Sequence, residues 1–123
     1  MSDLAADLRQ ALGDRRVKTG PTELSLYRKD SSNMAGWAQV VCLPETTGEV
    51  QACVRIARRH GVPFVPRGSG TGLSGGAVPL DGAVVIATTK MDRITSIDPV
   101  NRLAWVQPGV LNLDLSHQVA HLG

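Results

Sequence analysis

The chain has 123 residues, of which 42% are hydrophobic and 20% are charged, and its formal net charge is +2. This length and apolar content are typical of one packed domain and exclude a largely disordered chain. The small net charge and the aromatic content of 3% argue against a dedicated nucleic-acid binder. No stretch approaches the ~18 apolar residues of a membrane span, and no secretory leader pattern is present. We therefore expect a cytoplasmic protein without a membrane span.

The two cysteines, Cys42 and Cys53, lie in apolar surroundings and do not form a C-x-x-C motif. In a cytoplasmic chain such cysteines are usually reduced. We predict that both are free, buried thiols, and a disulfide between them is the less favoured alternative.

The chain begins with a short helical pattern that Ser2 or Asp3 can cap and Gly13 can end. The residues expected on its apolar face are Leu4, Leu8, Ala11 and Leu12. Residues 14–37 show no clear hydrophobic period, and we interpret them as a connecting arm. The first predicted unit is thus residues 1–37, a helix followed by this arm.

A strand–helix–strand unit follows the arm. The apolar run "AQVVCLP" (38–44) predicts a buried strand, and Thr46 with Glu49 forms a capping box at the start of a helix. The apolar face of this helix is expected to consist of Val50, Cys53, Val54 and Ala57. "VPFVP" (62–66) predicts the second strand, so the unit is βαβ with parallel strands.

The basic cluster Arg58-Arg59-His60 lies in the last turn of this helix, directly before Gly61. Positive charge at a helix C-terminus complements the helix dipole, and glycine suits the left-handed stop. We therefore interpret the cluster as a helix end and not as a ligand site.

The C-terminal third predicts antiparallel structure. A third strand is expected at 82–88, and 93–98 and 102–107 flank the turn "PVN" as a hairpin. A last helix is predicted from about 112 to 122, with Leu111, Leu115, Val119 and Leu122 on one face. The expected fold class is α+β: a small parallel βαβ subdomain, then the start of an antiparallel subdomain, with flanking helices.

The stretch "PRGSGTGLSGGAVP" (66–79), which we call the glycine loop, holds five glycines between Gly68 and Gly76. It contains a G-x-G-x-x-G pattern, but no helix can open directly after it, because Pro79 and then a strand follow. This excludes the Rossmann fingerprint, and the lack of G-K-[ST] excludes a P-loop. A loop that only allows a tight crossover remains an alternative, although it explains fewer glycines.

The third interpretation is a phosphate cradle. Successive backbone N–H groups can form an anion-binding nest, and glycine permits the positive φ angles that a nest needs. The hydroxyls of Ser69, Thr71 and Ser74 add uncharged donors. The loop also follows the carboxyl end of a predicted parallel strand, where open α/β sheets bind ligands.

The glycine loop and its flanks, "VVCLPETTGEVQACVRIARRHGVPFVPRG" and "VVIATTKMDRITSIDPVNRLAWVQPGV", resemble FAD-linked oxidases of the vanillyl-alcohol oxidase type, with a PCMH-type FAD-binding fold. The resemblance is greatest to the branch of glycolate oxidase flavin subunits and D-lactate dehydrogenases, and it makes 38–123 the N-terminal part of such a domain. It implies FAD bound through Pro66, Arg67, Gly68, Ser69, Gly70, Thr71, Gly72, Leu73, Ser74, Gly75 and Gly76.

The resemblance implies further that the backbone of 67–71 wraps the pyrophosphate, while 73–76 passes near the flavin. Thr71 stands where many relatives carry the histidine that links flavin covalently, so non-covalent FAD is expected. The implied reaction is hydride transfer from a small 2-hydroxy acid to flavin, followed by electron transfer to an acceptor, with other subunits of an oxidase complex as further partners.

The family's FAD-binding region continues beyond Gly123, and relatives take their substrate-binding residues largely from that later portion. We therefore expect a fragment or a truncated frame, and we name no catalytic residue. The alternatives are a stand-alone phosphate- or nucleotide-binding module and a remnant that binds nothing.

The motif "HQVAH" (117–121) has the histidine spacing of H-E-x-x-H, and Asp114 lies one turn earlier. However, Gln118 replaces the glutamate of that motif, and these residues lie opposite the predicted apolar face. We predict a solvated helix face and no metal.

Overall fold

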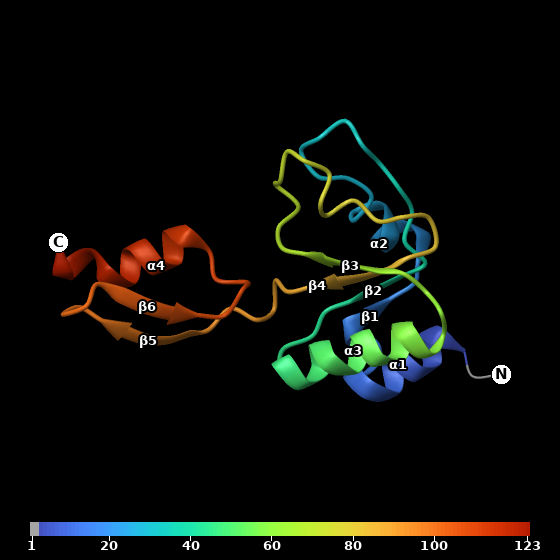
Figure 1. Ribbon diagram of the computed structural model, residues 1–123, viewed down its shortest axis with the longest axis horizontal. Helices are drawn as coiled ribbons and strands as arrows, with labels where there is room; N and C mark the ends of the chain where they lie inside the picture. Colours follow the sequence, from blue (N-terminus) through green and yellow to red (C-terminus); the bar gives the residue numbers. More distant parts are fainter. Residues whose placement is uncertain (1–2) are drawn as a thin grey trace.

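The computed structural model describes residues 3–123 and shows two lobes joined by one crossing of the chain (Figure 1). The N-terminal lobe, residues 3–91, holds a sheet between helices and loops. The C-terminal lobe, residues 92–123, holds a hairpin and a helix. This confirms the predicted α+β class and the change from parallel to antiparallel structure along the chain.

The sheet of the N-terminal lobe has four strands in the order β1-β2-β4-β3, namely Val17–Lys18, Val40–Cys42, Val84–Ala87 and Phe64–Arg67. Strands β2 and β3 are parallel, as predicted, and β4 lies between them and is parallel to both. The predicted strand–helix–strand unit therefore does not consist of neighbouring strands. Strand β1 pairs antiparallel with β2 and was missed, because two residues are too few to show a period.

Helices α1 (Leu4–Leu12) and α3 (Thr47–Arg59) cover one face of this sheet (Figure 1). The Asp3 carboxylate caps α1 by accepting from the Ala5 N–H at 3.2 Å, whereas Ser2 lies outside the described residues. Gly13 ends α1 with a φ of +89°. The Thr46 hydroxyl caps α3 by accepting from the Glu49 N–H at 3.1 Å, which confirms the predicted N-cap.

The apolar faces of the two helices differ slightly from the prediction. In α1, Leu4, Leu8 and Leu12 are buried, but Ala11 is exposed, because the buried stripe follows the i, i+4 row alone. In α3, Cys53 and Ala57 are buried as predicted, Val50 and Val54 are only partly buried, and Ile56 is buried as well. At the C-terminus of α3, Asp7 of α1 pairs with Arg59 and His60, so the basic cluster has a structural partner.

Two apolar clusters lie on the two faces of the sheet, because successive strand residues point to opposite sides. Val40, Cys42, Val84 and Ile86 pack with α1 and α3, whereas Val41, Leu43, Val85 and Ala87 face α2 (Pro21–Ser25) and the arm. Both cysteines are free and buried in the first cluster, as predicted. Contact with the Cys53 thiol, together with burial, raises the pKa of the Cys42 thiol well above its ordinary value.

The C-terminal lobe consists of β5 (Ile94–Asp98), β6 (Leu103–Val106), α4 (Asn112–Val119) and the 3₁₀ turn η2 (Ala120–Leu122). Strands β5 and β6 form the predicted antiparallel hairpin. The predicted last helix is therefore an eight-residue α-helix followed by a 3₁₀ turn. From residue 92 onward, no described residue is buried.

Candidate functional site: the glycine loop and its arm

The glycine loop leaves the carboxyl end of β3, and the chain then returns to β4 without forming a helix. Pro66 and Arg67 are still part of β3, and the Arg67 carbonyl accepts a hydrogen bond from the Thr88 N–H at 2.8 Å. The loop thus lies at the carboxyl edge of the parallel strands, where such sheets bind ligands. The missing helix confirms that the loop is not a dinucleotide fingerprint of the Rossmann type.

Two glycines of the loop adopt the left-handed conformation that the nest hypothesis requires. The φ angles are +72° at Gly70 and +78° at Gly75. Gly68 does not have a positive φ, so glycine there is not required by the backbone conformation. A Cβ atom built on Gly68 or Gly76 would meet no protein atom within 4 Å, so both positions face open space.

The donors of the glycine loop are free of partners within the described chain. None of the backbone N–H groups of residues 68–74 donates a hydrogen bond to another described residue. The hydroxyls of Ser69, Thr71 and Ser74 are exposed and make no hydrogen bond within residues 3–123. The loop sequence carries no carboxylate. An uncharged surface rich in free donors fits an anion such as a pyrophosphate.

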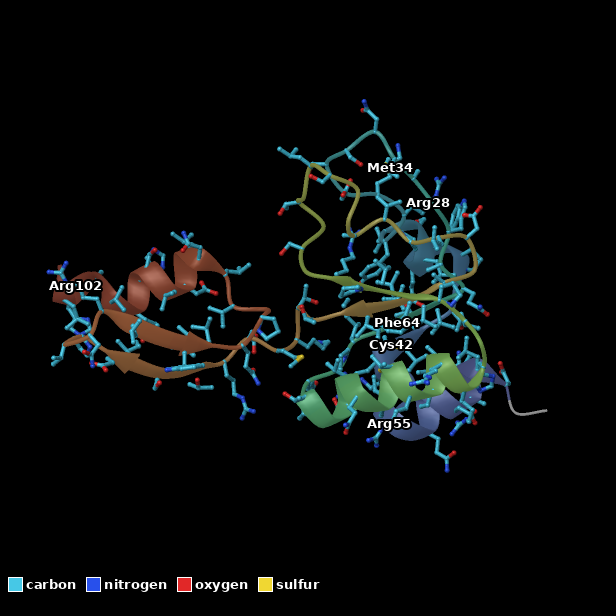
Figure 2. All side chains as sticks on the ribbon, viewed as in Figure 1. Arg28, Met34, Cys42, Arg55, Phe64 and Arg102 are labelled. Atoms are coloured by element: carbon cyan, nitrogen blue, oxygen red, sulfur yellow. The ribbon has the colours of Figure 1, made fainter. Side chains whose placement is uncertain are left out.

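The arm forms one wall of the glycine loop, which sequence reasoning missed. The Ser31 N–H donates to the Gly72 carbonyl at 2.9 Å, and the Met34 sulfur lies directly against Gly75. Figure 2 shows Met34 on the arm near the top of the N-terminal lobe. A side chain at Gly75 would overlap this sulfur, so the present packing of Met34 on the loop requires that Gly75 has no Cβ.

The polar residues of the arm hold its own turn and contribute to the wall. The Asp30 carboxylate accepts from the Ser32 N–H at 2.7 Å, an Asx turn that the sequence "DSS" could have indicated. Hydrogen bonds from the Ser32 side chain and backbone, and from the Gly75 N–H, lower the pKa of Asp30. Asp30 therefore stays charged at neutral pH, although its Oδ2 atom is buried without a hydrogen-bond partner.

A second connection joins the end of the arm to the segment between the loop and β4. The Trp37 N–H donates to the Asp81 carboxylate at 2.9 Å, and the Gly82 N–H donates to the Trp37 carbonyl at 2.7 Å. Gly36 packs so closely on the Pro79 carbonyl that a Cβ there would overlap it. The arm is therefore hydrogen-bonded both to the loop itself and to the segment that follows the loop, and these bonds limit where the loop can lie.

The loop surface is open. Leu73 at its tip is 79% exposed, and Leu80 is 70% exposed. Exposed apolar side chains beside free backbone donors suit a ligand that has a charged part and an apolar part. An FAD molecule has this composition, with a pyrophosphate and an isoalloxazine ring, so the residues present fit this cofactor.

The histidine motif lies in the C-terminal lobe, away from the glycine loop. Asp114 and His117 lie on α4 and line a hollow toward β5, whereas His121 lies in η2. Among residues 3–123, no group of three or more His, Cys, Asp or Glu side chains could hold a metal ion. Likewise, no helix in the described part of the chain is both long and apolar enough to cross a membrane.

Comparison with known proteins assigns the family. The family model of the FAD binding domain matches residues 38–123. This chain belongs to that FAD-binding family, and FAD is its cofactor, as the family resemblance implied.

Relatives of known name agree with this assignment. The chain is 43% identical over 122 residues to the glycolate oxidase subunit GlcD of Bacillus subtilis, covering 98% of this chain and 26% of that protein. It is 34% identical over 114 residues to a D-lactate dehydrogenase of Anaerostipes hadrus, covering 91% of this chain and 24% of that protein. The chain thus spans about a quarter of the length of each.

The fold agrees with a solved structure as well. The crystal structure of p-cresol methylhydroxylase with substrate bound superposes with a TM-score of 0.86 at 28% identity, over 96% of this chain and 24% of that chain. The predicted PCMH-type FAD-binding fold is therefore confirmed.

Proposed function

We propose that this chain supplies the pyrophosphate-binding part of a flavoprotein that oxidises a small 2-hydroxy acid of the glycolate or D-lactate type. The observation that carries the proposal is the row of unpartnered backbone donors at residues 68–74, held at the carboxyl edge of β3. The names of the two relatives supply the substrate class. Bound FAD would accept a hydride from the α-carbon of the acid, and an electron acceptor, with other oxidase subunits, would complete the system.

In this proposal the chain's own residues bind and orient the cofactor. The backbone of 67–71 would hold the pyrophosphate, and the exposed hydroxyls of Ser69, Thr71 and Ser74 would donate to it. Residues 73–76 would pass near the flavin, with Leu73 against its apolar ring. The contacting set is Pro66, Arg67, Gly68, Ser69, Gly70, Thr71, Gly72, Leu73, Ser74, Gly75 and Gly76.

The proposal includes non-covalent attachment and a cytoplasmic location. Thr71, at the tip of the loop, has a hydroxyl where a histidyl link would need an imidazole, so acid or denaturant should release FAD completely. The test is to denature the FAD-loaded protein and separate the polypeptide from free flavin. Flavin absorbance that stays with the polypeptide would contradict non-covalent binding at this loop.

Binding itself is tested by titrating FAD into the purified chain and following flavin fluorescence. We expect saturable but weak binding, because phosphate contacts on an open surface are screened by water and salt. Gly68→Leu should weaken binding at least about tenfold, because the Cβ of the new side chain would enter open space where no protein atom lies within 4 Å.

Gly48→Ala is the matched control, because Gly48 lies in α3 and its Cβ would meet only the Thr46 hydroxyl at 3.8 Å. This variant should bind FAD like the wild type. A Gly68→Leu variant that folds and binds FAD unchanged would contradict binding at the loop. Tight binding by the wild type at physiological salt would instead show that residues 1–123 form a complete, stand-alone site.

A further inference from the structure

The side chain of Arg67 is a buried positive charge beneath the glycine loop. Only 8% of the residue is exposed. None of the ion pairs among the described residues includes Arg67, although Arg16, Lys18 and Arg59 all have a carboxylate partner. The unpartnered nitrogens of its guanidinium are not among the fully buried atoms of the described residues, so solvent or a ligand can reach this charge.

The hydrogen bonds of Arg67 occupy only one end of its guanidinium. Nη1 donates to the Lys29 carbonyl at 2.8 Å and to the Ala77 carbonyl at 3.4 Å. Within residues 3–123, Nε and Nη2 donate to no other residue. The guanidinium lies 5.4 Å from the centre of the Tyr27 ring, which supports it from the side of the arm.

The free end of the guanidinium faces the loop backbone. A Cβ atom built on Gly70 would overlap Nη2, so the charge lies directly under this residue. The same residue has the positive φ that exposes successive N–H groups to a ligand. The loop therefore combines free dipoles on its surface with one fixed cation immediately beneath them.

We propose that Arg67 is the fixed counter-charge of the glycine loop and makes the loop prefer ligands that carry a pyrophosphate over neutral flavins. The inference rests on the proposed function and adds to it. Carbonyls of Lys29 and Ala77 hold the guanidinium in place but leave its charge uncompensated, and a bound pyrophosphate compensates it. A purely structural brace would need the hydrogen bonds and not the charge.

The substitution Arg67→Gln separates these two roles, because a glutamine amide can still donate to a carbonyl but has no charge. The probes are FAD and ADP, which both contain a pyrophosphate, and riboflavin, which contains none. We expect about tenfold weaker binding of FAD and ADP to Arg67→Gln, with riboflavin affinity changed less than about twofold. Arg67→Lys should restore most of the preference, since it restores the charge.

Arg55→Gln is the charge-matched control. Arg55 is exposed on α3, on the opposite side of the sheet from Arg28 and Met34 of the arm (Figure 2). This variant should bind all three ligands like the wild type. Circular dichroism and the melting temperature establish that each variant is folded.

A salt titration of the wild type provides a test that needs no variant. Raising the salt concentration should weaken FAD and ADP binding and leave riboflavin binding unchanged, because only the first two depend on a charge–charge attraction. Two results would overturn this inference but leave the proposed function standing. One is an equal loss of affinity for all three ligands in Arg67→Gln, and the other is a response of FAD binding to salt that is no larger than that of riboflavin binding. A wild-type chain that binds none of the three would overturn the proposed function and this inference with it.

Discussion

The two lobes of this chain use similar apolar residues in opposite ways. In the N-terminal lobe, the parallel strands β2 and β4 are buried on both faces, between α1 and α3 on one side and α2 with the arm on the other. In the C-terminal lobe, Leu103, Trp105 and Val106 of β6 are all exposed, and Trp105 is 72% exposed. Both lobes contain strands and a helix, but only one has a core.

The difference between the lobes shows how much more apolar surface a sheet buries when other elements cover both of its faces. A two-stranded hairpin with one helix against it cannot bury its strands on both sides, and isolated hairpins are marginal in water. The four-stranded sheet has an element on each face, so alternate residues of one strand enter two separate clusters. We therefore expect the stability of the chain to reside in the N-terminal lobe, which also holds the glycine loop.

The largest difference in stability should come from replacing one leucine by alanine in each lobe. Leu8→Ala, at a side chain that is 0% exposed, should lower the free energy of unfolding by about 2–5 kcal/mol through lost burial and a cavity. Leu113→Ala, at a side chain that is 63% exposed, should change it by less than about 0.5 kcal/mol. Urea denaturation followed by circular dichroism measures both. Equal losses would show that the C-terminal lobe has a core of its own.

Replacing the glycines of the loop by alanine should have a smaller effect on stability, and the effect should differ from one glycine to another. Gly70→Ala and Gly75→Ala should each cost about 1 kcal/mol or more, because both residues have positive φ and a neighbouring side chain where the Cβ would lie. Gly68→Ala should cost less than about 0.5 kcal/mol, because Gly68 lacks a positive φ and its Cβ would face open space. Thermal unfolding of the three variants provides the comparison, and identical melting temperatures would show that the loop conformation is not specified by glycine.

The smallest effect concerns pH and the ion pair at the start of α3. Arg16 donates to both Glu49 carboxylate oxygens, at 2.6 and 2.8 Å, and these hydrogen bonds lower the pKa of Glu49 below its ordinary value of 4.5. A lowered folded-state pKa means that the pair stabilises the fold above pH ~4.5 and that this contribution disappears as the pH falls through the folded pKa.

Glu49→Gln should therefore cost about 1 kcal/mol at pH 7 and progressively less below pH ~4.5. Urea unfolding of wild type and variant between pH 3 and 7 measures the difference. Glu23→Gln is a suitable control, because Glu23 pairs with Lys18 at 3.0 Å through a more exposed carboxylate. A cost at Glu49 that does not depend on pH would show that packing, and not charge, supports this helix end.

Local signals in the sequence predicted most of the elements near the site. The N-cap at Thr46, the glycine at the end of α3 and the turn between β5 and β6 each depend on residues within one turn or one hairpin. For the same reason the sequence placed the glycine loop directly after a parallel strand. The positive φ at Gly70 and Gly75 agrees with the positive φ angles that a nest needs, whereas Gly68 has none.

The contacts of the arm with the loop could not be predicted in this way. The bond from Ser31 to Gly72 joins residues 41 positions apart, and no period or motif in residues 14–37 indicates it. The position of β4 between β2 and β3 likewise depends on which strand edges pair, and a hydrophobic run does not indicate which strand will lie beside it. Ala11 was assigned to the apolar face because helical spacing alone does not fix the width of the buried stripe.

The sequence by itself therefore predicted a phosphate-binding loop and the change from parallel to antiparallel strands. These follow from glycine content, hydroxyl donors and short-range spacing, which act within a few residues of the chain. Only the tertiary structure showed that the arm forms a wall of the loop and that Arg67 lies beneath Gly70 without a carboxylate partner. Those features depend on which distant segments of the chain pack together. The burial of a charge and the absence of a carboxylate partner can be seen only when the positions of all neighbouring residues are known.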